Sequence, residues 1–133
     1  MVSEQDLGWL AGFFDGEGCI SLSRKGKVHV PGVQVVIVNT DKALLTKAQS
    51  ILDALEIDST IYIHSVRPSG RKEAFRLQVG SSKGIRRFFA KVPIQSQEKL
   101  LKYEVLKSSI PHKSIGHTSA RHQRLVRQYP QLL

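Results

Sequence analysis

The sequence predicts an α+β fold in which two β-hairpins alternate with helices. Four short segments of the 133-residue chain show the period-two alternation of apolar and polar residues that is typical of strands. They come in two pairs, and a stretch with helical periodicity follows each pair. We therefore expect a single domain, residues 1–133, with the order αββαββα. Its four-stranded antiparallel sheet should carry helices on one face.

The first expected element is a helix over residues 4–14. Its apolar positions follow the i, i+3, i+4, i+7 spacing of one helix face: Leu7, Leu10, Ala11 and Phe14. Gly8 and Gly12 are four residues apart, and together with Ala11 they make a nearly bare surface. Each glycine costs about 1 kcal/mol relative to alanine inside a helix. Two of them therefore suggest that another backbone approaches closely at this surface.

Two acids follow the apolar run, in the sequence Asp15-Gly16-Glu17-Gly18. A carboxylate at a helix C-terminus faces the negative end of the helix dipole, so helix stability does not explain it. A bound divalent cation would explain it. The alternative is a tight turn between a helix and a strand with two solvated acids.

The later elements follow from the same two periodicities. Strands are expected over residues 19–25, 28–38, 59–66 and 73–80, and helices over 42–55, 81–90, 97–108 and, more weakly, 118–128. Pro31-Gly32 interrupts the second strand and predicts a bulge or kink. The almost continuously apolar run 33–38 predicts a central strand.

The charge is unevenly distributed. The chain has a formal net charge of +9, but residues 1–63 sum to −3 and residues 64–133 to +12. Such a basic half makes nucleic acid the expected polyanionic partner, and a merely soluble basic surface is the alternative. No apolar run is long enough to span a membrane, and the acidic, polar N-terminus resembles neither a signal nor a transit peptide. We therefore expect an intracellular protein without a membrane partner.

The sheet face opposite the core should present rows of polar side chains. The strands contribute Ser21, Ser23, Lys25, Lys27, Gln34, Tyr62, His64, Arg76 and Gln78, and the turn after the third strand adds Arg67, Arg71 and Lys72. Cations and amides suit base edges in the major groove and the phosphates beside it. The alternative is an ordinary solvated sheet face.

Residues 10–18, L-A-G-F-F-D-G-E-G, resemble the motif of the LAGLIDADG homing endonucleases in all nine positions. The motif occurs once, which by resemblance implies a single-motif member that acts as a homodimer. The two motif helices would then pack at the two-fold axis, with Gly8, Ala11, Gly12 and Asp15 at the interface. The resemblance further implies a saddle-shaped sheet that sits in the major groove.

The resemblance also implies the chemistry and its residues. Glu17 would be the metal ligand, the backbone carbonyl of Gly16 a second ligand, and Mg²⁺ the cofactor, with Mn²⁺ as a possible substitute and no organic cofactor. Asn39 would orient water, or simply form a turn. Lys99, or else Gln97, would stabilise transition-state charge, and an exposed helix lysine is the alternative. The expected reaction is site-specific double-strand cleavage of a long, near-palindromic duplex that leaves short 3′ overhangs.

The homing type further implies an intracellular location, in the same compartment as the genome that hosts its intron or intein. Two rival functions use the same scaffold. One is an RNA maturase that grips intron RNA with the basic C-terminal half. The other is a DNA-binding regulator that has lost cleavage.

Overall fold

The computed structural model describes residues 2–24, 31–65 and 73–110. The helices are α1 (Glu4–Glu17), α2 (Lys42–Ala54), α3 (Ser82–Lys91) and α4 (Gln97–Leu106), and a 3₁₀ turn, η1 (Lys107–Ser109), follows α4. The strands are β1 (Gly18–Arg24), β2 (Pro31–Asn39), β3 (Thr60–Ser65) and β4 (Ala74–Val79). The element order is the predicted one. The helix expected over 118–128 lies outside the described residues.

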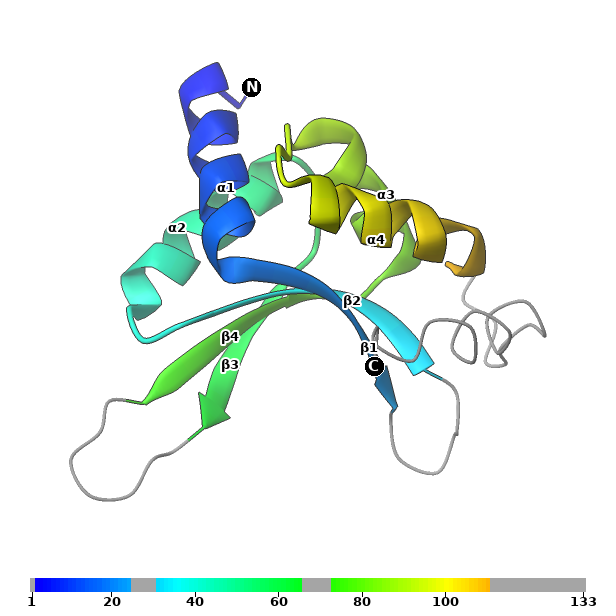
Figure 1. Cartoon of the computed structure of the whole chain (residues 1–133). Helices are drawn as coiled ribbons and strands as arrows, with labels where there is room; N and C mark the ends of the chain where they lie inside the picture. Colours follow the sequence, from blue (N-terminus) through cyan, green and yellow to red (C-terminus); the bar gives the residue numbers. More distant parts are fainter. Residues whose placement is uncertain (1, 25–30, 66–72, 111–133) are drawn as a thin grey trace.

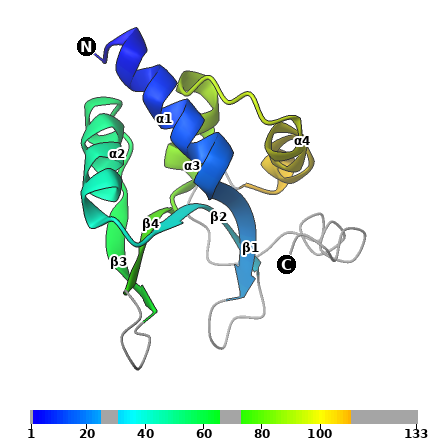
Figure 2. The ribbon, with the colours of Figure 1, turned by 60° about the vertical axis from the view of Figure 1, so that its left-hand side comes forward.

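The strands form one antiparallel sheet in the order β1-β2-β4-β3. β2 is central, as its apolar run predicts. Figures 1 and 2 show the four described helices on one side of an arched sheet, which confirms the α+β architecture. The opposite side, called the outer face below, is not covered by any described helix.

The hydrophobic core lies between the helices and the sheet. Leu10 and Phe14 of α1 are fully buried, and the Phe14 ring meets the Phe88 ring of α3 edge-on at 4.9 Å between centroids. From the sheet, Ile37 and Leu77 are each 2% exposed and pair with each other across β2 and β4. Because side chains alternate along a strand, the residues next to Ile37 on β2 and next to Leu77 on β4 point to the outer face.

Helix α1 is longer than its apolar pattern predicts. It runs to Glu17, so Asp15 and Gly16 are helical and the predicted end at residue 14 is wrong. Gly18 caps the helix by donating its backbone N–H to the carbonyl of Phe14. Gly16 is tolerated inside the last turn because contacts with α4, described below, stabilise this helix end.

Of the bulge or kink predicted at Pro31-Gly32, the structure contradicts the bulge. These two residues pair in register with Arg24 and Ser23, and Pro31 begins the described part of the strand, where proline is acceptable. The irregularity lies instead in β3, between Ile63 and Ser65.

Gly18 is required by its contact with Phe14, and we expect Gly18→Ala to destabilise the fold. An added Cβ would lie 2.2 Å from Cδ2 of the fully buried Phe14 ring, so the ring or the helix end must move. Overpacking of this kind costs about 1–3 kcal/mol. Urea unfolding measures the loss, and Gly80→Ala, whose added Cβ meets nothing closer than 3.5 Å, is the matched control. Equal stability of the two variants would contradict this packing.

Candidate functional site

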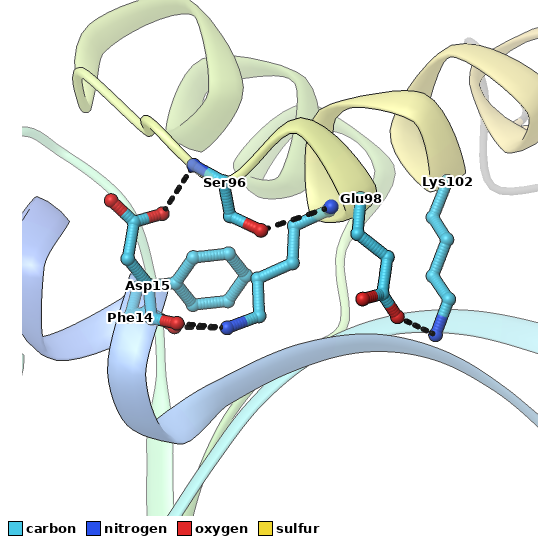
Figure 3. A network of polar contacts seen from close by, with 6 residues as sticks. Phe14, Asp15, Ser96, Glu98 and Lys102 are labelled. Carbon is cyan, nitrogen blue, oxygen red and sulfur yellow. Dashed lines mark hydrogen bonds and ion pairs between the residues drawn. The ribbon is translucent and has the colours of Figure 1, made fainter.

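The junction between α1 and β1 brings the two motif acids to different places. Glu17 and Gly16 are exposed, whereas Asp15 is half-buried and faces α4. The carboxylate of Asp15 accepts hydrogen bonds from the backbone N–H groups of Gln95, at 3.0 Å, and Ser96, at 3.0 Å. Figure 3 shows Asp15 and Ser96 facing each other across this contact. Asp15 therefore ties the end of α1 to the beginning of α4.

Lys99 completes this link from the α4 side. Its ammonium group donates to the backbone carbonyl of Phe14 at 2.9 Å and also to that of Asp15. The Phe14 carbonyl also accepts from the backbone N–H of Gly18, but the later carbonyls of this last turn, beginning with that of Asp15, lack such partners and carry the negative end of the dipole. A cation at this place satisfies them. Asp15 and Lys99 thus form a reciprocal clamp, called the α1–α4 clamp below, directly before Gly16 and Glu17.

Loss of the α1–α4 clamp should loosen the site. We expect Asp15→Ala to destabilise the protein by about 2–3 kcal/mol, because hydrogen bonds to a charged group contribute more than neutral ones and two backbone donors lose their acceptor. Denaturant unfolding measures the effect. Asp53→Ala, which changes an exposed aspartate of α2, is the control and should change stability little. A stability loss no larger than that of the control would show that the clamp does not hold the two helices together.

Asn39 lies at the end of β2 beside the same junction. Ile37 pairs with Gly18, and β2 continues two residues beyond that pair, so its end runs past the point where α1 enters β1. The Asn39 side-chain oxygen accepts from the backbone N–H of Asp41 at 2.8 Å, and Asp41 in turn caps α2. The structure thus shows a turn-forming role for Asn39, and the bond engages only the oxygen of its amide.

The donor set at the α1 end is compatible with a hard divalent cation. The described residues hold no cluster of three or more His, Cys, Asp and Glu side chains that could cage a metal ion. Mg²⁺, however, needs only one or two carboxylates and takes its other ligands from water and phosphate. The exposed carboxylate of Glu17 and the exposed Gly16 backbone fit this need. The ammonium group of Lys99 shows that neighbouring carbonyl oxygens of this helix end already attract a cation.

The outer face carries the predicted polar side chains at the centre of the sheet. Strand register places Ser21 opposite Gln34 on β1 and β2, and Tyr62 opposite Arg76 on β3 and β4. Arg76 donates to the side-chain oxygen of Gln34 at 2.9 Å, and the Tyr62 hydroxyl bonds Gln78. Tyr62 is 42% exposed, but Gln34 is only 4% exposed, so the structure does not support the direct DNA contact predicted for Gln34.

Of the other residues predicted on the outer face, His64 has its side chain within the described residues, and the rest do not. His64 is exposed and lies at the β3 irregularity. Ser23 pairs with Gly32 in the sheet, but its side chain lies outside the described residues. The remaining cations also lie outside the described residues: Lys25, Lys27, Arg67, Arg71 and Lys72.

The glycines of α1 form an exposed stripe on the side away from the core. Gly8, Gly12 and Gly16 are spaced by four, and a Cβ added to any of them would meet nothing within 4 Å. The prediction that Ala11 shares this surface is wrong. Ala11 is 4% exposed and belongs to the core cluster of its own chain, because it lies four residues after Leu7 and three before the fully buried Phe14 on the same helix face. The stripe, defined by the three glycines, replaces it.

Two contacts of the site are absent from the sequence prediction. Gln95 and Ser96 hold Asp15 through their backbones, and no side-chain pattern signals such a contact. Ser96 does have a signal that would locate the beginning of α4, since its hydroxyl accepts from the backbone N–H of Lys99 as an N-cap. The bond between Arg76 and Gln34 joins residues 42 positions apart and has no sequence signal.

Comparison with known families identifies the motif helix and the sheet together. The family model described as "LAGLIDADG-like domain" matches residues 4–93, which is more than half of the chain. The chain belongs to the LAGLIDADG family. The match covers α1 through α3 and therefore includes the α1–β1 junction, the stripe and the whole sheet. A comparison with curated protein sequences finds no match.

Solved structures of LAGLIDADG-type homing endonucleases share the fold. The archaeal intron-encoded homing endonuclease I-Vdi141I, complexed with DNA, has a TM-score of 0.66 and 17% identity over 97% of this chain and 82% of its own. The homing endonuclease I-CvuI, in complex with the I-CreI target in the presence of Mg, has a TM-score of 0.61 and 14% identity over 98% of both chains.

Other members of this structural group are longer. The group I intron-encoded homing endonuclease I-CeuI, complexed with DNA, has a TM-score of 0.59 and 18% identity, and the match covers 83% of this chain. This chain spans 56% of the I-CeuI chain. None of the described helices combines the length and apolar character that crossing a membrane requires.

Proposed function

We propose that this protein is a site-specific DNA endonuclease of the homing type that acts as a homodimer with divalent metal ions. The observation that carries the proposal is the α1–β1 junction, where an exposed Glu17 follows an exposed glycine stripe on one helix. A helix partner on the stripe would bring the two Glu17 carboxylates of a dimer close together. Each subunit would then supply one acid to the pair of scissile phosphates.

The chemistry of phosphodiester hydrolysis fits these residues. When bound, divalent cations activate water and stabilise the leaving oxygen. Glu17 and the Gly16 carbonyl would hold such a cation, and Mg²⁺ or Mn²⁺ suits these hard oxygen ligands. Lys99 would add positive charge next to the site, since it already bonds the carbonyls of Phe14 and Asp15. Asn39 would orient water with the amide nitrogen that its turn bond does not engage.

DNA binding by the outer face is supported by its side chains and by the relatives. The sheet face that carries no described helix presents the hydroxyl of Tyr62, the cation of Arg76 and the amide of Gln78. These groups suit base edges in the major groove. I-Vdi141I, I-CvuI and I-CeuI were all solved as complexes with DNA. The net charge of +9 favours a polyanionic partner.

The homodimer is supported by the match to a longer relative as well as by the stripe. The LAGLIDADG meganuclease I-AabMI, bound to uncleaved DNA, matches 96% of this chain with only 50% of its own, at a TM-score of 0.51 and 19% identity. One copy of this chain therefore corresponds to half of that protein. Two copies with two-fold symmetry would read a long, near-palindromic duplex. Cleavage of both strands with short 3′ overhangs completes the proposal.

Selection from a randomised duplex library tests this function without a known target. Duplexes retained in Ca²⁺ should share a long, near-palindromic sequence, and they should be cut on both strands in Mg²⁺ but not in EDTA. Affinity should fall steeply as salt rises, because binding releases counterions from the phosphates. Retention of duplexes without cleavage in Mg²⁺ or Mn²⁺ would favour a non-cleaving regulator. Preferential retention of structured intron RNA over duplex DNA would favour a maturase.

A further inference from the structure

Gln34 is a polar side chain buried on the uncovered side of the sheet. Its neighbours Val33 and Val35 belong to the core beneath the helices, so Gln34 points to the outer face. Gln34 is nevertheless only 4% exposed, and it is the one polar side chain found buried among the described residues. No described helix covers this face, but Arg76 on β4 bonds Gln34 there.

Arg76 reaches Gln34 from a distant register position. Register places Arg76 opposite Val38 on β2. Gln34 lies on β2 as well, four residues before Val38. The Arg76 side chain therefore runs diagonally along the sheet to reach Gln34, past Val36, which is 3% exposed. Its Nη2 donates to the Gln34 oxygen at 2.9 Å. Arginine has only donors, so the amide orientation of Gln34 is fixed by chemistry: the oxygen must face Arg76.

The bond holds the guanidinium in one place before any ligand is bound. The Arg76 Nε atom is buried and has no hydrogen-bond partner within the described residues, and the guanidinium carbon lies 5.9 Å from the Tyr62 ring centroid. One of the five guanidinium N–H donors is thus used by Gln34 and one is buried, which leaves donors on the terminal nitrogens. A free arginine side chain has high rotamer entropy, and a contact that fixes it beforehand reduces the entropy lost on binding.

We propose that Gln34 is a specificity-positioning residue: it makes no base contact itself but fixes Arg76, whose remaining donors read a guanine in each half-site. This inference rests on the proposed DNA binding and deepens it by naming a residue pair that sets one base preference. Arginine prefers guanine because its paired donors match the O6 and N7 acceptors in the major groove. Without Gln34, Arg76 keeps its charge and its attraction to phosphates, but its guanidinium is no longer held in one orientation.

Selection of randomised duplexes in Ca²⁺, without cleavage, separates the two roles. Arg76→Ala should remove a guanine preference at one position of each half-site. Gln34→Leu, which removes the acceptor but keeps an apolar cover for Val36, should weaken the preference at that same position by about tenfold, within the range of one arginine–guanine contact. Gln34→Glu keeps an acceptor for Arg76 and should keep the preference.

The matched control is Gln49→Leu, since Gln49 bonds the Ser59 carbonyl from α2, on the covered side of the sheet. It should leave all base preferences unchanged. A Gln34→Leu effect at a position different from that of Arg76→Ala would mean that Gln34 reads a base itself, and it would overturn the proposal. Unchanged preferences in Gln34→Leu, or a lost guanine preference in Gln34→Glu, would overturn it as well. Failure of the unsubstituted protein to select any duplex would instead overturn the proposed function.

Discussion

Glu17→Gln should reduce DNA cleavage by at least about 10³-fold while DNA binding persists. The substitution keeps the size of the side chain but removes the carboxylate that we propose as metal ligand. Metal ions contribute several kcal/mol to stabilising the transition state of such reactions, and each 1.36 kcal/mol corresponds to a factor of ten in rate. Single-turnover cleavage of a selected duplex in Mg²⁺ measures the rate, and equilibrium binding in Ca²⁺ measures the affinity.

The exposed position of Glu17 makes this test clean. Its side chain makes no hydrogen bond or ion pair that holds the described residues together, so the variant should unfold at the same denaturant concentration as the unsubstituted protein. The matched control is Glu104→Gln, which removes an exposed carboxylate from α4, where Glu104 Oε2 lies 2.8 Å from Lys107 Nζ. This variant should cut DNA normally. Normal cleavage by Glu17→Gln would remove Glu17 from the proposed site.

Gly12→Leu should abolish both dimer formation and cleavage. A leucine at the middle of the stripe would separate two facing helices, and with them the two copies of Glu17. Within one chain the substitution meets no obstacle, because a Cβ at Gly12 has nothing within 4 Å. Replacing a helical glycine should even stabilise α1 by up to about 1 kcal/mol. A stable, folded monomer without activity is therefore the expected product.

Sedimentation of the free protein and cleavage of a selected duplex measure the two effects of Gly12→Leu. Ala90→Leu adds the same side chain to an exposed position of α3 and should change neither. A Gly12→Leu dimer with normal cleavage would show that the stripe is not where the subunits meet.

The sequence predicts the architecture well because the apolar periods are local. The alternation in β1 to β4 and the helical spacing of α2 reflect burial on one side, and the structure confirms all of these elements. The polar interruption at Gln34 is visible in the sequence, but its burial is not. Its bond to Arg76, which lies 42 residues away and reaches across the sheet, has no sequence signal either.

The sequence predicts the details of the α1–β1 junction less well. Glycine and acidic residues indicate a helix end at residue 14, but the helix continues to Glu17. Contacts between α1 and the start of α4, more than 80 positions later in the chain, stabilise this longer helix: Asp15 bonds Ser96, and Lys99 bonds Phe14. The sequence assigns Ala11 both to the apolar face of α1 and to the bare surface of Gly8 and Gly12. Its spacing to Leu7 and Phe14, four and three residues, decides between the two, and Ala11 faces the core.

The number of chains bound to one duplex tests the central claim most directly. The proposed site needs two copies of Glu17, one from each subunit. Analytical ultracentrifugation of a selected duplex in Ca²⁺ should therefore give two protein chains per duplex, and the same duplex should be cut on both strands when Mg²⁺ replaces Ca²⁺. A complex of one chain per duplex that still cuts both strands would contradict the shared site.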